Sequence, residues 1–350
     1  MTEAVAGADP QVVGPYLAQV LGDERWASCT VELIAGGKSN LTYFVSSAAG
    51  TVVLRRPPLG HVLPTAHDMG REHRVMAALA GTAVPVPRML HECTDATVLG
   101  QPFYVMERVE GHVCRDQLPQ GYADRPEQRW AIGEGLVSVL ADLHAVEPAV
   151  VGLAEFGRPE GYLVRQVSRW GKQWDATRIE GHDDLDLLAR DLAASVPASQ
   201  RLGLVHGDYR MDNTLLHPSA PGRVAAVLDW EMSTLGDTLA DLGVLLVYWA
   251  QADDGVGRDN SAIIPSGTSL PGFPTRAQVA ELYAARTGAD LTALPWCVAF
   301  GFFKLAVVCA GIVARVRGGA MVGGGFDGIE ARIGPLVGHG RATLADGTLH

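Results

Sequence analysis

The sequence predicts an α+β fold, with a small β-rich part up to about residue 110 and a larger, mainly helical part over residues 111–350. Two observations lead to this prediction. The first part contains four short runs with the composition of strands, at residues 30–35, 41–45, 51–56 and 103–107. After the fourth run, apolar residues recur at helical spacing instead. The change of period gives the expected boundary between the two parts.

Helices are expected where apolar residues recur three and four positions apart. In the first part this pattern covers Pro10–Leu21 and residues 65–80, the latter with a capping box, Thr65-x-x-Asp68, and Gly81 at its end. In the second part it covers residues 124–145, 162–179, 275–286 and 297–316. Lys304 and Arg315 interrupt the last, very apolar run, so we expect a buried helix there and no membrane span.

The composition excludes some classes of function. The net charge of −11 over 350 residues argues against a general nucleic-acid-binding protein, which would need a basic surface. The five cysteines are scattered and form no Cys-x-x-Cys pair, which is typical of reduced core residues. The acidic first ten residues lack the apolar segment of a signal peptide. We therefore expect a cytoplasmic protein that binds neither nucleic acid nor membrane.

The stretch 204–242 carries the strongest chemical signal. An apolar run leads into His206-Gly-Asp208, Asn213 follows five residues later, and a second β-branched run ends on Asp229. A strand, a loop and a strand would bring two carboxylates and a carboxamide together. Phosphoryl transfer needs such a set, because one carboxylate can accept the proton of an attacking hydroxyl while the other oxygens hold Mg²⁺. The alternative is a hairpin in which Asp and Asn only form turns.

The motifs HGDYRMDN, LDWE and GDTLADL resemble those of the aminoglycoside phosphotransferase and kinase-like superfamily. The resemblance implies a protein-kinase-like fold of two lobes, residues 1–110 and 111–350, with ATP and Mg²⁺ as cofactors. It makes Asp208 the catalytic base, Asn213 and Asp229 the Mg²⁺ ligands, and Arg210 the residue that faces the γ-phosphate. Other polar residues of the stretch are expected to brace the loop, namely His206, Asp237 and Asp241. Glu231 is interpreted either as a metal or substrate contact or as a capping carboxylate.

The glycine-containing turn at residues 36–40, GGKSN, suits a loop that lies over phosphates. It is not a Walker A loop, because Glu32 stands where the first glycine should be. The sequence GGKSNLTY resembles the first motif of the same family, and we expect Gly37, Ser39 and Asn40 to bind the nucleotide. An ordinary hairpin turn would have the same composition.

The strand at residues 51–56 ends in two arginines, where protein kinases place a lysine that holds the α- and β-phosphates. Adjacent strand residues point to opposite faces, so only one of the two can face the nucleotide, and we expect Arg55. Glu72 is interpreted either as the helix carboxylate that pairs with this cation or as a solvated residue. The resemblance also places the adenine-binding hinge after the strand at 103–107, at Glu107 and Val109.

The helix at residues 162–179 carries Arg165, Arg169 and Lys172 on one face, with Trp170 and Trp174 between them. One interpretation is a solvated charged face over a tryptophan-anchored core. The other is a cationic groove for a substrate that bears a phosphate or carboxylate. A specialised site for a polycationic aminoglycoside should be rich in acidic residues instead.

The segments RRPPLGHVLPTAHDM and 162–179 look most like the kinase-like domains associated with acyl-CoA dehydrogenases. This resemblance implies ATP-dependent transfer of phosphate to a hydroxyl of a small molecule, a hydroxyacyl-CoA or a hydroxy acid, and a dehydrogenase as partner. One alternative is a true aminoglycoside kinase, favoured if acidic residues converge on the site, namely Asp253, Asp254, Asp259 and Glu231. The other is a catalytically silent module that binds a nucleotide or acyl-CoA. Residues 251–275, rich in Gly, Pro, Ser and Asp, have the composition of a mobile loop that could cover the substrate.

Overall fold

The computed structural model describes residues 6–34, 40–59, 68–254, 264–318 and 328–349. The chain forms two compact units, and the first of them is discontinuous in sequence. It comprises residues 1–110 together with 225–233, and the second unit comprises residues 111–224 and 234–350. One boundary of this division falls after residue 110, and the nine residues 225–233 belong with the first unit.

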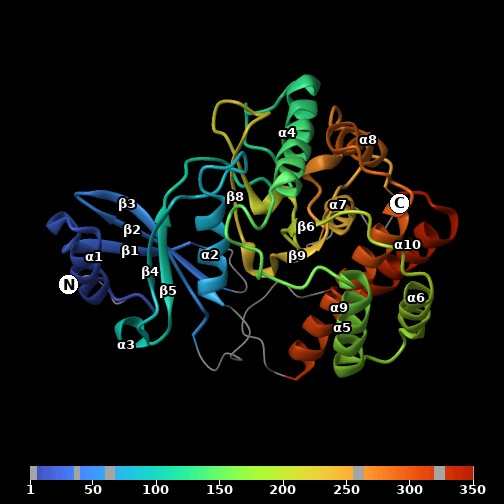
Figure 1. Ribbon diagram of the computed structural model, residues 1–350, viewed down its shortest axis with the longest axis horizontal. Helices are drawn as coiled ribbons and strands as arrows, with labels where there is room; N and C mark the ends of the chain where they lie inside the picture. The colour runs from blue at the N-terminus through green and yellow to red at the C-terminus, as the bar shows by residue number, and fades with distance from the viewer. Residues whose placement is uncertain (1–5, 35–39, 60–67, 255–263, 319–327, 350) are drawn as a thin grey trace. The chain divides into compact units, whose positions relative to one another are not determined.

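The first unit is built on a five-stranded antiparallel sheet with the order β1-β2-β3-β5-β4. The strands are β1 (Cys29–Leu33), β2 (Leu41–Ser47), β3 (Gly50–Arg56), β4 (Met89–Cys93) and β5 (Phe103–Glu107). Helices α1 (Pro10–Leu21) and α2 (Met69–Leu79) lie on opposite sides of this sheet (Figure 1). The core under α1 takes alternate residues of the strands, such as Tyr43, Leu54 and Val105, as the twofold period of a strand requires. The intervening residues face α2.

Two helical predictions for this unit have different outcomes. Helix α1 spans the predicted residues, with Asp9 accepting a hydrogen bond from the Gln11 N–H at 2.9 Å. Helix α2 begins later than predicted, because Asp68 is itself the N-cap and accepts from the Arg71 N–H at 3.0 Å. The predicted capping box, with Asp68 inside the helix, is therefore wrong, and Thr65 lies outside the described residues. A short helix α3 (Ala96–Leu99) completes the unit.

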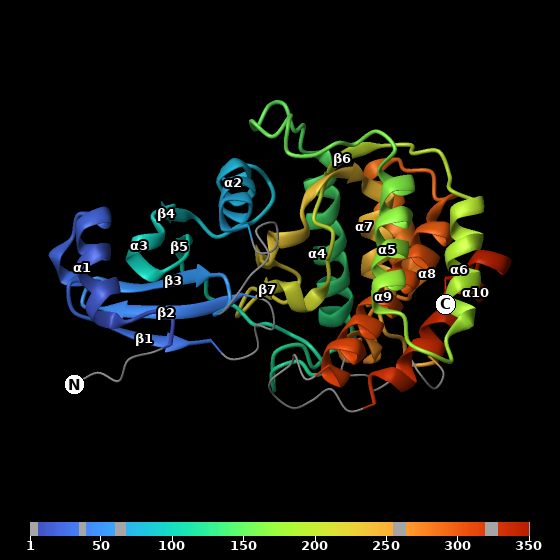
Figure 2. The ribbon, with the colours of Figure 1, turned by 90° about the horizontal axis from the view of Figure 1, so that it is seen from below.

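The second unit is mainly helical (Figure 2). Its helices are α4 (Pro126–Ala145), α5 (Tyr162–Thr177), α6 (Asp183–Ala194), α7 (Thr238–Val247), α8 (Arg276–Thr287), α9 (Leu294–Arg317) and α10 (Ile333–Asp346). Strands β6 (Leu202–Val205) and β9 (Thr234–Asp237) pair antiparallel within this unit. Strand β7 (Thr214–Leu216) follows the loop after β6, and β8 (Val224–Val227) carries the chain into the first unit.

Helix α9 is the central helix of the second unit and packs against α5, α6, α7 and α10. It is the only described helix that is long and apolar enough to cross a membrane, and most of its apolar stretch is buried in the structure. The prediction of a buried helix at 297–316 is thus confirmed, with three more residues at its start and one at its end. This packing places Lys304, in the middle of α9, inside the unit.

Candidate functional site

A cluster of ionised side chains in the first unit is centred on Arg55. Its Nε lies 3.1 Å from Glu72 Oε2, and its Nη2 contacts Asp229 Oδ1. Glu72 is fully buried and also accepts hydrogen bonds from the Tyr104 hydroxyl and the Asn40 amide, both at 3.0 Å. Of the two interpretations of Glu72, the structure favours the partner of Arg55 over the solvated residue. The cluster therefore joins β3, α2 and the segment that returns from the second unit.

Successive side chains of strand β3 point to opposite faces of the sheet, and this decides which of its two arginines joins the cluster. Arg55 points to the side of the sheet that faces α2, whereas Arg56 points to the side of α1 and donates to the carbonyls of Gly7 and Leu99. Arg56 is 3% exposed, and its guanidinium is held by these carbonyls on the side of α1. The choice of Arg55 over Arg56, made from strand geometry, agrees with this arrangement.

Asp229 has an unusual backbone conformation. Its φ of 64° and ψ of 59° make it the one non-glycine residue with positive φ among the residues that the structure describes. The left-handed region is sterically unfavourable for such residues, and it persists where the surroundings impose it, often at functional sites. Here the next residue, Trp230, is buried and donates from Nε1 to the Val227 carbonyl at 3.0 Å. Arg71 of α2 holds the Ser233 carbonyl at 2.9 Å, so the segment is anchored on both sides of Asp229.

Among the described residues, this cluster holds more carboxylates than guanidinium groups. The pKa of Glu72 is raised to about 7, chiefly by burial and also by the nearby Asp229 carboxylate, although Arg55 opposes both effects. Burial alone would lower the pKa of Arg55, but Tyr104 and the surrounding carboxylates, including Glu231, raise it overall. One guanidinium therefore faces three carboxylates. A divalent cation beside Asp229 suits this surplus of negative charge.

The predicted nucleotide loop is described only at its last residue. Gly37 and Ser39 lie outside the described residues. The Asn40 amide donates to Glu72 and, at 3.3 Å, to Glu231, and its buried Oδ1 has no hydrogen-bond partner among the described residues. Asn40 thus contacts two carboxylates, and its binding of phosphate stays a prediction.

The two hinge residues differ in what their backbones already bind. The Glu107 N–H donates to the Arg88 carbonyl at 2.9 Å, and the Glu107 carboxylate accepts from the Arg88 N–H at 2.9 Å. Neither group is therefore available to adenine. The Val109 N–H has no backbone partner in the described part of the chain. Binding of adenine stays a prediction for both residues, and Val109 is the better donor.

In the second unit, the loop between β6 and β7 gathers the predicted catalytic residues. The Asn213 amide donates to the Asp208 carbonyl at 2.9 Å and to Asp208 Oδ2 at 3.0 Å. Both of its N–H groups are directed at Asp208, so the Asn213 Oδ1 is the atom left to ligate a cation. Within the described residues, no three His, Cys, Asp or Glu side chains form a metal-binding group by themselves. Mg²⁺ commonly takes one or two protein ligands together with waters and substrate phosphates, and its binding here stays a prediction.

Arg210 lies between two carboxylates. Its Nε donates to Asp208 Oδ2 at 3.2 Å, and its Nη1 lies 3.0 Å from Asp212 Oδ2. The guanidinium also stacks over the ring of Tyr248, 4.7 Å from its centre. Arg210 therefore orients Asp208 in this structure, and its expected contact with the γ-phosphate stays a prediction.

The loop is braced from α7, as the sequence predicted. The Asp241 carboxylate accepts from the N–H groups of His206 at 2.6 Å and Gly207 at 2.7 Å. His144 bonds the same carboxylate at 3.3 Å and the Tyr283 hydroxyl at 2.7 Å. Burial alone would raise the pKa of Asp241, but His144 and His206 outweigh burial and the pKa is lowered. Asp237 is the N-cap of α7 and accepts from the Leu239 N–H.

Sequence reasoning missed Lys304 as part of this loop. Its ammonium donates to the Gly207 carbonyl at 2.7 Å, next to Asp208, and lies 5.6 Å from the centre of the Trp170 ring. Burial lowers the pKa of Lys304, although Asp208 and Asp241 oppose that effect. The available signal was the lysine in the middle of an otherwise apolar run, the same feature that argues against a membrane span.

The three basic residues of α5 are exposed. Arg165 donates to the carbonyls of Arg158 and Glu160, and so caps the start of its own helix. The Arg169 guanidinium lies 6.0 Å from the ring of Trp170, and its charge acts on Lys304. Lys172 is also exposed. The structure therefore has the exposed basic face, and the charge of Arg169 acts on Lys304, which bonds the catalytic loop.

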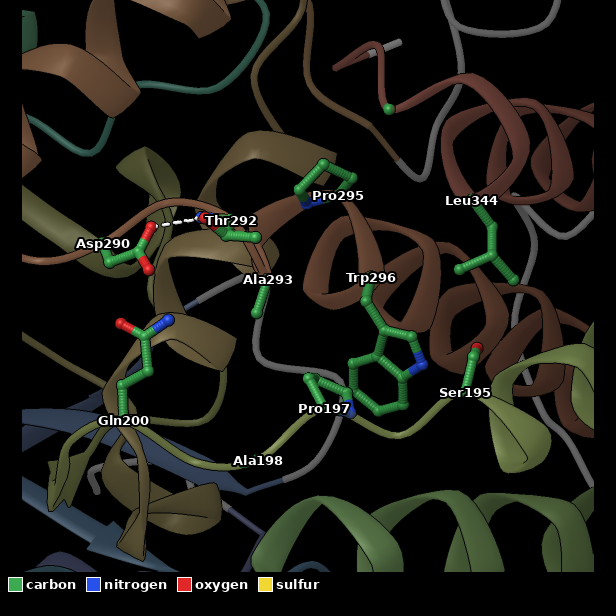
Figure 3. A pocket seen from close by; sticks show the side chains of 11 residues that line it. Ser195, Pro197, Ala198, Gln200, Asp290, Thr292, Ala293, Pro295, Trp296 and Leu344 are labelled. Carbon is green, nitrogen blue, oxygen red and sulfur yellow. Dashed lines mark hydrogen bonds between the residues drawn. The ribbon is translucent and has the colours of Figure 1, made fainter.

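A hollow of about 520 Å³ lies elsewhere in the second unit (Figure 3). Trp296 at the start of α9 forms part of its wall, with Ser195, Asp290 and Leu344 around it. None of the predicted site residues lines this hollow. It has no pair of a base and a metal ligand, and we assign the chemistry to the loop of Asp208.

Comparisons with known proteins agree with these features. A model of the phosphotransferase enzyme family matches residues 30–291. The chain is 37% identical to rat acyl-CoA dehydrogenase family member 11 over 86% of this chain and 38% of that protein. It is 35% identical to mouse acyl-CoA dehydrogenase family member 10 over 86% of this chain and 28% of that protein. The chain thus spans about a third of the length of these relatives.

Solved structures show the fold. A provisionally named aminoglycoside phosphotransferase from Ralstonia eutropha JMP134 is 34% identical, with a TM-score of 0.79 over 96% of this chain and 98% of that one. Aminoglycoside phosphotransferase APH(4)-Ia, crystallised with ADP and hygromycin B, is 14% identical, with a TM-score of 0.61 over 96% of this chain and 99% of its own. The predicted α+β, protein-kinase-like fold is confirmed.

Proposed function

Because the chain belongs to the phosphotransferase enzyme family, we propose that it transfers the γ-phosphate of ATP to a hydroxyl group of a small molecule. The observation that carries the proposal is the arrangement of Asp208, whose Oδ2 receives hydrogen bonds from Asn213 and Arg210 at 3.0 and 3.2 Å. A carboxylate fixed in this way can accept the proton of an attacking hydroxyl. A module that only binds nucleotide has no need of such a base.

The residues of each unit have distinct roles in this reaction. Asp208 orients the acceptor hydroxyl and takes its proton, while Arg210 keeps the carboxylate in place. Asn213 and Asp229 would hold Mg²⁺, which neutralises charge on the nucleotide phosphates when bound. Arg55 binds the α- and β-phosphates and is oriented by Glu72. Gly37, Ser39 and Asn40 would bind the nucleotide phosphates, and Val109, two residues after Glu107, would receive adenine.

The proposed acceptor is a hydroxyacyl-CoA or a related hydroxy acid. The names of the relatives from rat and mouse, acyl-CoA dehydrogenase family members 11 and 10, support an acyl-CoA substrate and a dehydrogenase as the partner of this chain. The exposed basic face of Arg165, Arg169 and Lys172 suits an anionic acceptor. We place the reaction in the cytoplasm, without nucleic acid or membrane as partner.

An aminoglycoside acceptor is the second candidate, supported by the structure of APH(4)-Ia with hygromycin B. A polycationic acceptor would favour unpaired acidic residues around the site. Asp254, one of the four acidic residues considered for this purpose, is 2.5 Å from Arg276 and so is neutralised. Asp259 lies outside the described residues.

The test is an assay of ADP release with hydroxyacyl-CoAs, free hydroxy acids and aminoglycosides as parallel acceptors. Mass spectrometry of each acceptor should show one added phosphate for the correct class. Phosphorylation of an aminoglycoside alone would replace the proposed acceptor. Binding of Mg-ATP without product from any class would favour the silent module.

A further inference from the structure

Gly207, the residue before Asp208, is held by charged groups from two different helices. On one side, the carboxylate of Asp241 in α7 accepts from the N–H groups of His206 and Gly207. On the other side, Lys304 of α9 donates to the Gly207 carbonyl at 2.7 Å. Gly207 has a φ of 82°, the left-handed conformation that glycine adopts readily. The two bonds fix both ends of this residue and so the direction in which Asp208 leaves the turn.

Lys304 is a charged residue in an otherwise apolar helix. Helix α9 is almost entirely apolar over its central turns, and the sequence neighbours Phe303 and Leu305 are buried. An ammonium group in a packed helix carries a desolvation penalty, against which its hydrogen bond to the Gly207 carbonyl and its cation–π contact with Trp170 act. Its contact with the catalytic loop is the feature that gives the lysine a role at this position.

The groups that face the ammonium come from three elements. They are Asp208 and Arg210 of the catalytic loop, Asp241 of α7 and Arg169 of α5. The ring of Trp170, also on α5, lies beside the ammonium at 5.6 Å. The two carboxylates in this set are Asp208, the proposed base, and Asp241, which braces the catalytic loop.

We propose that Lys304 is a positioning residue for phosphoryl transfer, which holds the Gly207 carbonyl and thereby aims the Asp208 carboxylate at the acceptor hydroxyl. This inference rests on the proposed function, since it assigns Asp208 the role of base. Lys304 acts through Gly207, with no contact to the reacting atoms of its own. Misplacement of a catalytic group by about 1 Å can cost on the order of 10²-fold in rate, so the contact can matter greatly.

The test compares Lys304→Met, Lys304→Arg and Arg315→Met in the full-length protein. Arg315 is an exposed cation near the end of the same helix and serves as the matched control. For Lys304→Met we expect kcat to fall by ~10–100-fold with the KM for ATP nearly unchanged. The melting temperature should change little, because the loss of the hydrogen bond to Gly207 and the relief of the desolvation penalty oppose each other. Lys304→Arg should recover part of the lost kcat, and Arg315→Met should behave as the wild type.

Hydrogen–deuterium exchange adds a readout that does not depend on turnover. Lys304→Met should speed exchange in the peptides that cover residues 203–214 and leave those of the first unit unchanged. Unchanged exchange in this loop, or an unchanged kcat, would overturn the inference. A lower melting temperature together with a lower kcat and a higher KM for ATP would overturn it too, because a lysine that only packs the helix would give that result. If the wild type transfers no phosphate, the proposed function is what fails, and the exchange experiment still decides whether Lys304 orders the loop.

Discussion

Glu72 is the residue in which burial and charge are most directly opposed. It is fully buried, lies 3.1 Å from Arg55, and accepts hydrogen bonds from Tyr104 and Asn40. Its pKa is nevertheless raised to about 7, because desolvation of the carboxylate and the Asp229 charge outweigh the guanidinium. The ionised form of Glu72 orients Arg55, so the state of this carboxylate near neutral pH affects the shape of the whole cluster.

We expect Glu72→Gln to change how stability depends on pH. In the wild type, the folded state binds the proton of Glu72 more tightly than the unfolded state, so the unfolding free energy should fall as the pH rises from about 4.5 to about 7. The Gln variant lacks this contribution and should show a flatter dependence over the same range. Urea unfolding of both proteins at several pH values measures the difference. Parallel curves would mean that Glu72 has an ordinary pKa.

Asp208→Asn tests the base. The amide keeps the shape and can still take part in hydrogen bonds with Asn213 and Arg210, but it cannot accept a proton from the acceptor. Turnover should fall by ~10²–10⁴-fold, and the affinity for ATP should stay nearly the same. Steady-state kinetics together with calorimetric titration of ATP separate these two effects. Turnover at the wild-type rate would exclude Asp208 as the base.

Among the elements, the short turn of helix at Trp230–Met232 has the most demanding geometry. It begins directly after Asp229, whose φ is 64°, and it ends at Ser233, which Arg71 of α2 holds by its carbonyl. Strand β8, this turn and helix α2 together hold the Asp229 carboxylate in a fixed direction. In the structure that carboxylate faces Arg55, and binding of a cation would have to compete with this ion pair.

Asp229→Ala should remove the stabilisation that Mg-ATP gives to the protein. A ligand that binds only the folded state at 100 times its dissociation constant stabilises it by about 2.7 kcal/mol, which a thermal melt detects as a clear shift. The variant should show little or no shift with Mg-ATP, while Asp191→Ala, an exposed carboxylate of α6, should shift as the wild type does. An undiminished shift in Asp229→Ala would take this residue out of the metal site.

Strand periodicity and motif spacing predicted the elements that carry the site. The alternation of TVVLRR identified Arg55, and the spacing of HGDYRMDN placed Asp208 and Asn213 in one loop. Strand β4, with its mixed sequence MLHEC, and helices α6 and α10 were not predicted. Lys304 was missed for a different reason. The direction in which a helical side chain points follows from how its helix packs on its neighbours, and local sequence does not contain that information.

At the scale of the whole molecule, the net charge of −11 contrasts with the basic face on α5. The negative total repels a distant anion, so local basic residues must supply any attraction to an anionic acceptor. Arg169 is the member of that face whose charge reaches Lys304 and, through it, the catalytic loop. It is therefore the residue at which the acceptor class can be tested.

Reversal of this charge in Arg169→Glu should raise the KM of a hydroxyacyl-CoA and leave ATP binding unchanged. The effect should weaken with added salt, because exposed charges are screened over about 8–10 Å at ordinary ionic strength. Arg190→Glu, at an exposed arginine of α6, controls for the change in total charge. A lower KM for an aminoglycoside in Arg169→Glu would point to a polycationic acceptor. Equal kinetics for all acceptors in both variants would mean that the face is only solvated.

The interrupted first unit has a consequence for synthesis on the ribosome. Residues 225–233 complete a unit whose other residues end at 110. The ribosome must therefore add 123 residues after residue 110 before the unit is complete. At roughly 5–20 residues per second, this takes about 6–25 s of translation. During that interval the nascent sheet can form and Arg55 can meet Glu72, but Asp229 has not yet been made. The lobe that is translated first is therefore the one that reaches its final state late, and a fragment ending at residue 110 would lack the carboxylate on which its proposed metal site depends.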